Sequence, residues 1–379
     1  MQKICNWKNI LLLNLIIIGL TSCGEKITST DVFIEQMYAG EHTDDYALKI
    51  STFKEELPLT GYKINLYESK ELAYTCDLSS KTITNKDSLV IFNKDFSEDK
   101  TINSNSIVLP DNYLYGKYYL EILDSNNCLV DSLGIKGFSI EYLEKGSIIR
   151  LDEYRKAHGN YEKLDYVSVR YDSFKYLKDE TKSPISLDEL LKGPTIDKQY
   201  IGLRFNDTDK PLGGFVEANV KRLGDGDTTF FYFLNNSSLD SNKSVRYLLI
   251  DTPEVDHGPG SHITAEAWGD EAARVNNEKL KNAKRILIQS NKGAQLKENY
   301  GRYLGYVWYS NEIDGDYSSF RNLNYEMALD GLARFSTYDK YVEMYSNNIL
   351  YYDYFNYAAS LAKSKGIKIY GEKDPNFKS

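Results

Sequence analysis

Three short segments of this chain carry charged residues whose types suit hydrolysis of a phosphodiester bond. An apolar stretch begins with Arg246 and ends with Asp251, and Glu254 follows it after a proline. Asp227 precedes this stretch in a turn, and Arg302 comes later beside a glycine. A buried strand has no packing reason to hold charges at its ends. Phosphodiester hydrolysis needs a group that activates water, a hard cation and guanidinium groups for the oxyanion, and these side chains suit those tasks.

The elements that must position these residues read as a small barrel with helices. β-rich or alternating runs predict five strands, around residues 216–220, 229–234, 245–250, 286–288 and 303–309. Polar residues 235–244 predict a hairpin loop between two of them. Helical periodicity appears in three places, near residues 266–281, 321–330 and 350–361. A five-stranded barrel with packed helices is the OB-fold, whose exposed face commonly handles oligonucleotides.

The spacing of these motifs resembles the active site of the staphylococcal (thermo)nuclease family. The matching segments are Asp225-Gly-Asp227-Thr228, Arg246-Tyr-Leu-Leu-Ile-Asp251-Thr252-Pro253-Glu254 and Tyr300-Gly-Arg302. Further matches are Gly269-Asp-Glu-Ala272, residues 324–333 and Gly366-Ile-Lys-Ile-Tyr370. The resemblance covers residues 213–373 and implies an OB-fold nuclease domain. One departure is the loop at residues 255–264, which contains no lysine, whereas the family archetype is lysine-rich there.

The resemblance assigns a role to each residue of the expected site. The predicted metal ligands are Asp227, Asp251 and the backbone carbonyl of Thr252. These hard oxygen donors fit Ca²⁺ better than Zn²⁺, so Ca²⁺ is the expected cofactor.

The remaining roles also follow from the resemblance. Glu254 is expected to be the general base, Arg246 and Arg302 to clamp the phosphate, and Tyr300 to lie near the nucleotide. A guanidinium suits the clamp because its planar fork meets two oxygens and stays charged. The implied activity is cleavage of DNA and RNA that leaves 3′-phosphates.

The N-terminal half has many short β-rich runs separated by turns, which predict an immunoglobulin-like β-sandwich over residues 31–178. It resembles the bacterial lamin-tail domain through Leu59-Thr-Gly-Tyr62, Asp131-Ser-Leu-Gly134 and Ile149-Arg-Leu151. We expect a two-domain chain in which this module is a spacer or a binding platform for a ligand that the sequence does not identify. Residues 179–212 are polar and proline-containing, and they predict a linker with one short helix near residues 187–191.

The first residues predict export and lipid anchoring. Two lysines and a short apolar run precede Leu20-Thr-Ser-Cys23, which resembles the bacterial lipobox. Residues 1–22 are therefore the expected signal peptide, Cys23 the lipidated residue and residues 23–30 a tether, with the protein on the extracellular face of the membrane. Cys76 and Cys128 could form a disulfide or remain buried free thiols.

Charge limits how such a protein holds nucleic acid. The net charge of −9 excludes a basic arm, so affinity must come from local cations and a bound metal. The chain is expected to be a monomer. The alternative from another class is a catalytically inert surface binding or adhesion lipoprotein. The dense tyrosines between Tyr338 and Tyr357 fit a packed core better than a base-stacking surface.

Overall fold

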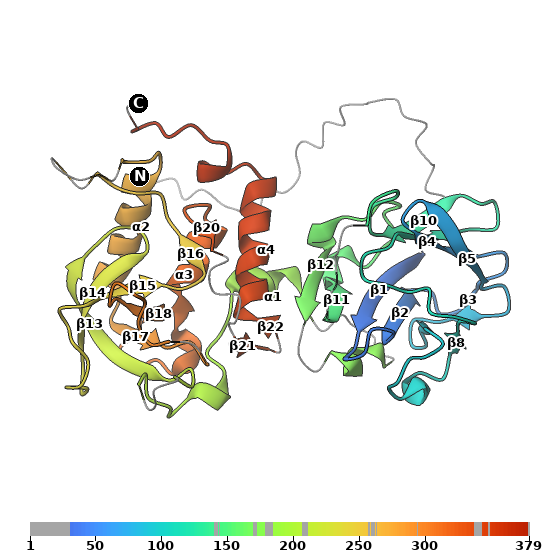
Figure 1. Cartoon of the computed structure of the whole chain (residues 1–379), viewed down its shortest axis with the longest axis horizontal. Coiled ribbons are helices and arrows are strands. Elements are labelled where there is room, and N and C mark those ends of the chain that lie inside the picture. Colours follow the sequence, from blue (N-terminus) through green and yellow to red (C-terminus); the bar gives the residue numbers. More distant parts are fainter. Residues whose placement is uncertain are drawn as a thin grey trace, which may run out of the picture.

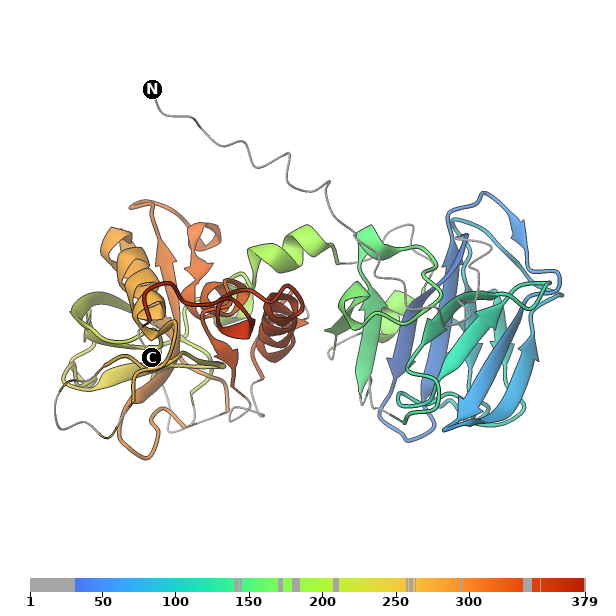
Figure 2. The same ribbon diagram turned by 90° about the horizontal axis from the view of Figure 1, so that it is seen from above.

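The computed structural model describes residues 31–139, 143, 145–169, 173–178, 185–206, 211–256, 258, 262, 264–293, 295–336, 343–347 and 349–377. They form an all-β N-terminal lobe and a mixed C-terminal lobe (Figures 1 and 2). The expected signal peptide, the tether and Cys23 lie outside the described residues. Within the described part, no helix is long and apolar enough to cross a membrane.

The N-terminal lobe contains two packed antiparallel-rich sheets. One has the order β12-β11-β1-β2-β7-β8, whose strands are Tyr166–Val169, Gly146–Arg150, Val32–Ala39, Tyr46–Thr52, Leu89–Phe92 and Ser106–Val108. The other has the order β10-β9-β4-β5, with strands Leu129–Leu133, Leu120–Leu123, Lys63–Glu68 and Glu71–Asp77. A short ribbon pairs β3 (Leu57–Pro58) with β6 (Thr82–Ile83). The predicted sandwich architecture is confirmed, whereas the lamin-tail likeness stays a prediction.

Apolar side chains from both sheets fill the space between them, including Ile34 on β1 and Ile64 on β4. A buried ion pair also joins the sheets: Nη2 of Arg150 on β11 lies 2.9 Å from Oδ2 of Asp131 on β10. Both side chains are almost fully buried, and the Asp131 carboxylate also accepts a hydrogen bond from the Ile34 amide at 2.8 Å. Cys76 and Cys128 are free thiols in the structure, but only Cys76 is buried, whereas Cys128 is partly exposed.

The C-terminal lobe is a closed five-stranded barrel, as predicted. The barrel strands follow the order β15-β14-β13-β17-β18, with bounds Ser244–Tyr247, Thr228–Phe233, Phe215–Leu223, Arg285–Gln289 and Tyr303–Ser310. A sixth short strand, β19 (Arg321–Asn322), pairs with β18. A parallel pairing of β15 with β18, which sets Val245 opposite Tyr303, closes the barrel. Two-stranded ribbons add β16 (Ile250–Asp251) with β20 (Arg334–Phe335), and β21 (Tyr345–Ser346) with β22 (Ile349–Leu350).

One predicted strand is wrong in its continuity. Residues 245–250 were expected to run as a single strand, but the chain turns between β15 and β16. Leu249 has a φ of 63°, a left-handed conformation that is unusual for a residue with a side chain. The Leu248 amide bonds the Gly305 carbonyl at 3.1 Å before the chain turns toward β20. Apolar content alone could not reveal this turn, because Leu249 is fully buried.

Three α-helices fall where periodicity places them: α2 (Gly269–Asn282), α3 (Leu323–Leu329) and α4 (Tyr351–Ser364). The side chain of Asn322 caps α3 by accepting a hydrogen bond from the Tyr325 amide at 2.9 Å. The chain leaves α4 through Gly366, whose φ is 63°, as expected of a glycine C-terminal stop. Short 3₁₀ turns lie at Lys100–Ile102, Asp152–Tyr154, Lys163–Asp165, Phe174–Leu177, Lys198–Tyr200, Tyr317–Ser319 and Lys368–Tyr370.

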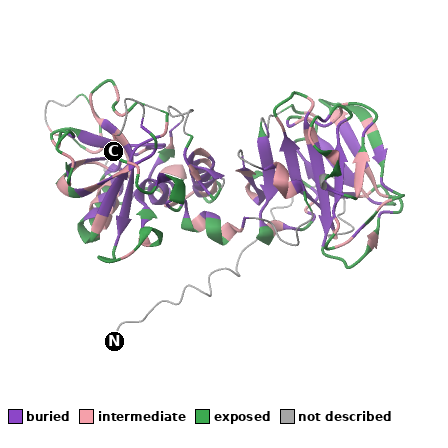
Figure 3. Cartoon of the chain, turned by 90° about the horizontal axis from the view of Figure 1, so that it is seen from below, coloured by how far each residue is buried: buried purple, intermediate pink, exposed green. Residues whose placement is uncertain are grey.

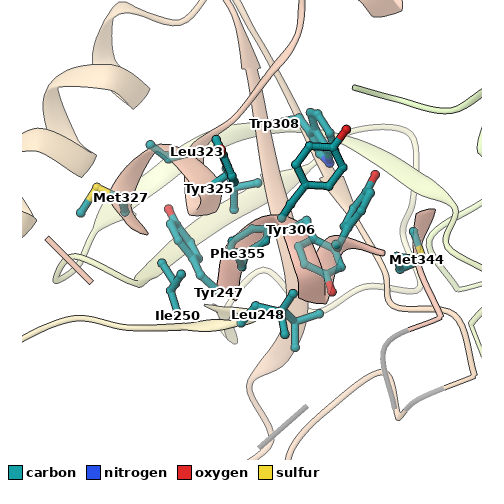
Figure 4. Close-up of a cluster of buried hydrophobic side chains, with 14 of the residues drawn as sticks. Tyr247, Leu248, Ile250, Tyr306, Trp308, Leu323, Tyr325, Met327, Met344 and Phe355 are labelled. Carbon is teal, nitrogen blue, oxygen red and sulfur yellow. The ribbon is translucent and has the colours of Figure 1, made fainter. Parts of the chain in front are cut away.

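Aromatic residues dominate the core of this lobe. Figure 4 shows Tyr306, Trp308, Tyr325 and Phe355 among its buried side chains. Phe355 on α4 lies edge-on to Tyr325, with ring centroids 5.6 Å apart. Three of the four α4 tyrosines, at positions 351, 354 and 357, are buried and Tyr352 is partly buried, which confirms the core interpretation for this helix. Tyr338 lies outside the described residues.

The segment assigned to a linker is packed where the structure describes it. It contains α1 (Leu187–Lys192), close to the predicted short helix. Leu190, Tyr200 and Phe205 are buried and belong to the hydrophobic core of the C-terminal lobe. Helix α4 also touches the sandwich, where the Tyr357 hydroxyl donates to the Leu164 carbonyl at 3.1 Å. Figure 3 shows buried residues on the strands of both lobes and on helix α4.

Candidate active site

The structure brings Asp227, Arg246 and Asp251 into direct contact at one edge of the barrel. The guanidinium of Arg246 on β15 forms an ion pair with Asp227 through Nη1. Its Nη2 lies 2.6 Å from Asp251 Oδ1 and 3.3 Å from the Ile250 carbonyl oxygen. The Asp227 side chain is 2 % exposed, whereas that of Asp251 is 50 % exposed. The turn at Leu249 places Asp251 back beside Arg246, because a straight strand would carry it away.

Asp227 is fixed by the tight turn that precedes β14. The Asp225 carboxylate accepts the Asp227 amide at 3.2 Å, and Asp227 Oδ2 accepts the Thr252 amide at 2.8 Å. Gly226 is required here, because a Cβ at that position would lie 2.8 Å from side-chain atoms of Thr252 and Ala272. The three predicted metal ligands are therefore neighbours.

The donor set at these ligands contains only oxygen. Two carboxylates and a carbonyl match a hard cation such as Ca²⁺, which completes its coordination with water. Among the described residues no group of three His, Cys, Asp or Glu side chains could hold a metal.

Asp225 is a member of the site that sequence reasoning treated only as a turn residue. Burial raises the pKa of its carboxyl, while the charge of Arg246 and hydrogen bonds from Thr228 lower it. The Asp225 carbonyl accepts a hydrogen bond from the Asn276 side chain on α2 at 2.8 Å. The charge of Arg246 thus also acts on the carboxyl of Asp225. The first Asp of the Asp-Gly-Asp motif was the available signal.

The backbone of Glu254 is held from two sides. Its amide bonds the Glu266 carboxylate at 3.1 Å, and its carbonyl accepts the Glu266 amide at 2.9 Å. Helix α2 begins with Gly269, where a Cβ would lie only 2.2 Å from the Glu254 carbonyl oxygen. The start of α2 can approach Glu254 only because this residue is a glycine.

Arg302 directly precedes β18, the strand that pairs with β15, and β15 carries Arg246. It forms a forked ion pair with Glu298, with Nε 2.5 Å and Nη2 3.1 Å from the two carboxylate oxygens. These bonds raise the pKa of Arg302, and the charges of Asp225 and Glu254 act in the same direction. Arg302 is therefore within electrostatic range of the site, and Glu298 is a partner that the sequence did not indicate.

Tyr300 lies on the turn that precedes Arg302 and is 85 % exposed. Gly301, with a φ of 80°, makes the turn, and its amide bonds the Glu298 carbonyl at 2.9 Å. The Tyr300 ring is thus accessible to a ligand, as its predicted role requires.

Comparisons with known proteins agree with this geometry. The profile of the family described as "Staphylococcal nuclease homologue" matches residues 244–370, a range that begins at β15 and so contains Arg246 through Arg302 but not Asp227. The chain is 32 % identical over 157 residues to the SPbeta prophage-derived endonuclease YokF of Bacillus subtilis, covering 41 % of this chain and 45 % of that protein. It therefore spans less than half the length of this relative.

Two further relatives show the same level of identity. The endonuclease YncB of Bacillus subtilis is 31 % identical over 176 residues, covering 44 % of this chain and 72 % of YncB. An uncharacterised protein of Methanocaldococcus jannaschii is 32 % identical over 130 residues, covering 31 % of this chain and 58 % of that protein. The chain belongs to the staphylococcal nuclease family.

Proposed function

We propose that this protein is a Ca²⁺-dependent nuclease that hydrolyses phosphodiester bonds of DNA and RNA and leaves 3′-phosphates. The observation that supports this most directly is the position of the Arg246 guanidinium between Asp227 and Asp251. The names of two relatives, both endonucleases, point in the same direction.

In this proposal Asp227, Asp251 and the Thr252 carbonyl hold the cation. When bound, Ca²⁺ supplies positive charge to a phosphoryl oxygen. Glu254 accepts a proton from the attacking water, whose oxygen bonds to phosphorus. The bond from phosphorus to the 5′ oxygen breaks, the 5′ oxygen leaves as a hydroxyl after taking a proton from solvent, and the phosphate stays on the 3′ oxygen. The fixed backbone of Glu254 limits where its carboxylate can reach, which favours one water position.

Arg246 and Arg302 bind the phosphate oxygens that gain charge in the transition state. Arg302 holds the two carboxylate oxygens of Glu298 in a fork, and a phosphate presents the same pair of acceptors. Substrate binding thus exchanges one oxyanion for another at Arg302. Tyr300 offers its exposed ring to the neighbouring base.

The test uses the full chain with end-labelled single-stranded DNA, in Ca²⁺ and in excess chelator. We expect cleavage only with Ca²⁺, and products whose 3′ phosphates are removed by a phosphatase. The rate of Arg302→Ala should be lower by about 10²–10³-fold. Arg274→Ala is the matched control. Like Arg302, this arginine forms ion pairs with glutamate, but it is exposed on the outer face of α2. Cleavage that survives chelation contradicts the metal assignment. Activity of Arg302→Ala equal to that of the wild type means that the cleavage lies elsewhere or comes from a contaminant, which is the outcome that the inert surface lipoprotein predicts.

We further propose that a lipid on Cys23 anchors the protein, as a monomer, to the extracellular face of the membrane. The lipobox-like segment supports this proposal. Cys23→Ser should release the protein from the membrane fraction without changing its specific activity. Equal membrane retention of this variant contradicts the anchor, and a light-scattering mass of two chains contradicts the monomer.

A further inference from the structure

A hollow of about 300 Å³ lies in the sandwich, in the lobe that does not carry the catalytic residues. It is formed by the end of β4, by β5 and by residues 111–118 ahead of β9. Its wall combines four aromatic rings and two carboxylates: Tyr67, Tyr113, Tyr115, Tyr118, Glu68 and Asp111. No Lys, Arg or His lines this hollow in the described part of the chain.

The rings of this hollow are held in place by further rings. Tyr74 stacks on Tyr113 with centroids 4.7 Å apart and planes within 2°. Tyr119 packs on Tyr67 at 5.5 Å, and its own hydroxyl bonds the buried Glu121 at 3.0 Å. Because these supports already fix the rings, a ligand does not have to order them on binding.

The electrostatics of the hollow favour a cation. The Tyr118 hydroxyl donates to Glu68 Oε1 at 3.1 Å, which keeps one carboxylate at the wall. The chain's own ammonium groups already lie over two of the rings, with Lys136 Nζ 5.2 Å from the Tyr67 centroid and Lys117 Nζ 5.6 Å from that of Tyr118. The ring faces thus attract positive charge where they are reached.

We infer that this hollow binds an alkylated ammonium cation of the choline type. Several aromatic faces with carboxylates nearby are the arrangement that proteins use for quaternary ammonium groups. The methyl groups contact the rings, while Glu68 and Asp111 compensate the charge. A phosphate-bearing polymer is disfavoured here, because the two carboxylates would repel it. The site is therefore separate from the proposed nuclease chemistry.

The test is calorimetric titration of the full chain with choline and with its neutral isostere 3,3-dimethyl-1-butanol. We expect choline to bind and the isostere to bind at least about tenfold more weakly, since it keeps the shape but loses the charge. Glu68→Gln and Asp111→Asn should each weaken choline several-fold. The matched control is Glu71→Gln, an exposed carboxylate on β5 outside the hollow, which should leave binding unchanged.

A second pair of variants distinguishes the contribution of the Tyr118 ring to choline binding from that of its hydroxyl. Tyr118→Phe should retain choline binding, whereas Tyr118→Leu should lose it, and an unchanged thermal unfolding curve of both variants reports an intact sandwich. The inference is overturned if the isostere binds as tightly as choline, or if no heat appears up to about 50 mM choline, where a millimolar site saturates. Binding of a neutral oligosaccharide in place of choline also overturns it.

Discussion

Replacing Arg246 by alanine should destabilise the protein in a way that Ca²⁺ specifically repairs. The guanidinium compensates two carboxylates, one of them 2 % exposed, and is itself 22 % exposed. Breaking a fully buried pair costs about 3–5 kcal/mol, and an exposed pair about 0–1 kcal/mol. The intermediate burial here gives a loss of about 2 kcal/mol, or a fall in Tm of about 4–8 °C.

The reason is that Arg246→Ala removes the ion pair of the buried Asp227 and leaves Asp251 with a longer contact to Arg334, whose Nη1 lies 4.0 Å from Asp251 Oδ2. A bound Ca²⁺ would compensate the charge that Arg246 no longer does. Ca²⁺ should therefore raise the Tm of Arg246→Ala by several degrees more than that of the wild type. The assay is thermal unfolding followed by circular dichroism, in chelator and in Ca²⁺, with Arg274→Ala as the control for loss of an arginine. An equal Ca²⁺ shift in wild type and Arg246→Ala would refute the reasoning, even if the variant is inactive.

Three further changes test the site and the sandwich. Glu254→Gln should lower kcat by about 10²–10⁴-fold and leave Tm unchanged, because it removes the proton acceptor but not the backbone bonds; Glu278→Gln on the outer face of α2 serves as control, and a drop in Tm would contradict this. Gly269→Ala should cost about 1–3 kcal/mol and reduce activity as well, because its Cβ must push the Glu254 carbonyl away; an unchanged melting curve would contradict the contact. Burial raises the pKa of Asp165 to about 6, so the folded state favours its protonated form and stability should fall as the pH rises from about 4 through 6. Asp165→Asn should flatten that dependence, as measured by the midpoint of urea unfolding at several pH values, and an unchanged slope would argue against a buried Asp165.

The candidate catalytic residues and the ends of the main elements were predictable from the sequence, because they depend on residue types at short spacings along the chain. The spacing of Asp227, Arg246 and Asp251 identified groups that the fold brings together, and Gly366 marked the end of α4. Alternation and periodicity likewise placed the barrel strands and three helices. These features depend on near neighbours in the chain.

What could not be predicted depends on partners far away in the sequence. The left-handed turn at Leu249 follows from pairing with β20, more than 80 residues later. The buried pair of Arg150 with Asp131 likewise needs two sheets to meet. The forked bond of Arg302 to Glu298 is local, yet no pattern distinguishes it from an ordinary surface pair.

The packing of residues 185–206 decides how the catalytic lobe can be excised. A fragment that starts at residue 213 would lose Leu190, Tyr200 and Phe205 from its interior, along with the α1 carbonyl that receives the Tyr325 hydroxyl. Such a fragment would expose part of its hydrophobic core to water and fold poorly. A fragment that keeps these buried contacts has to include residues 185–206 as well as the barrel.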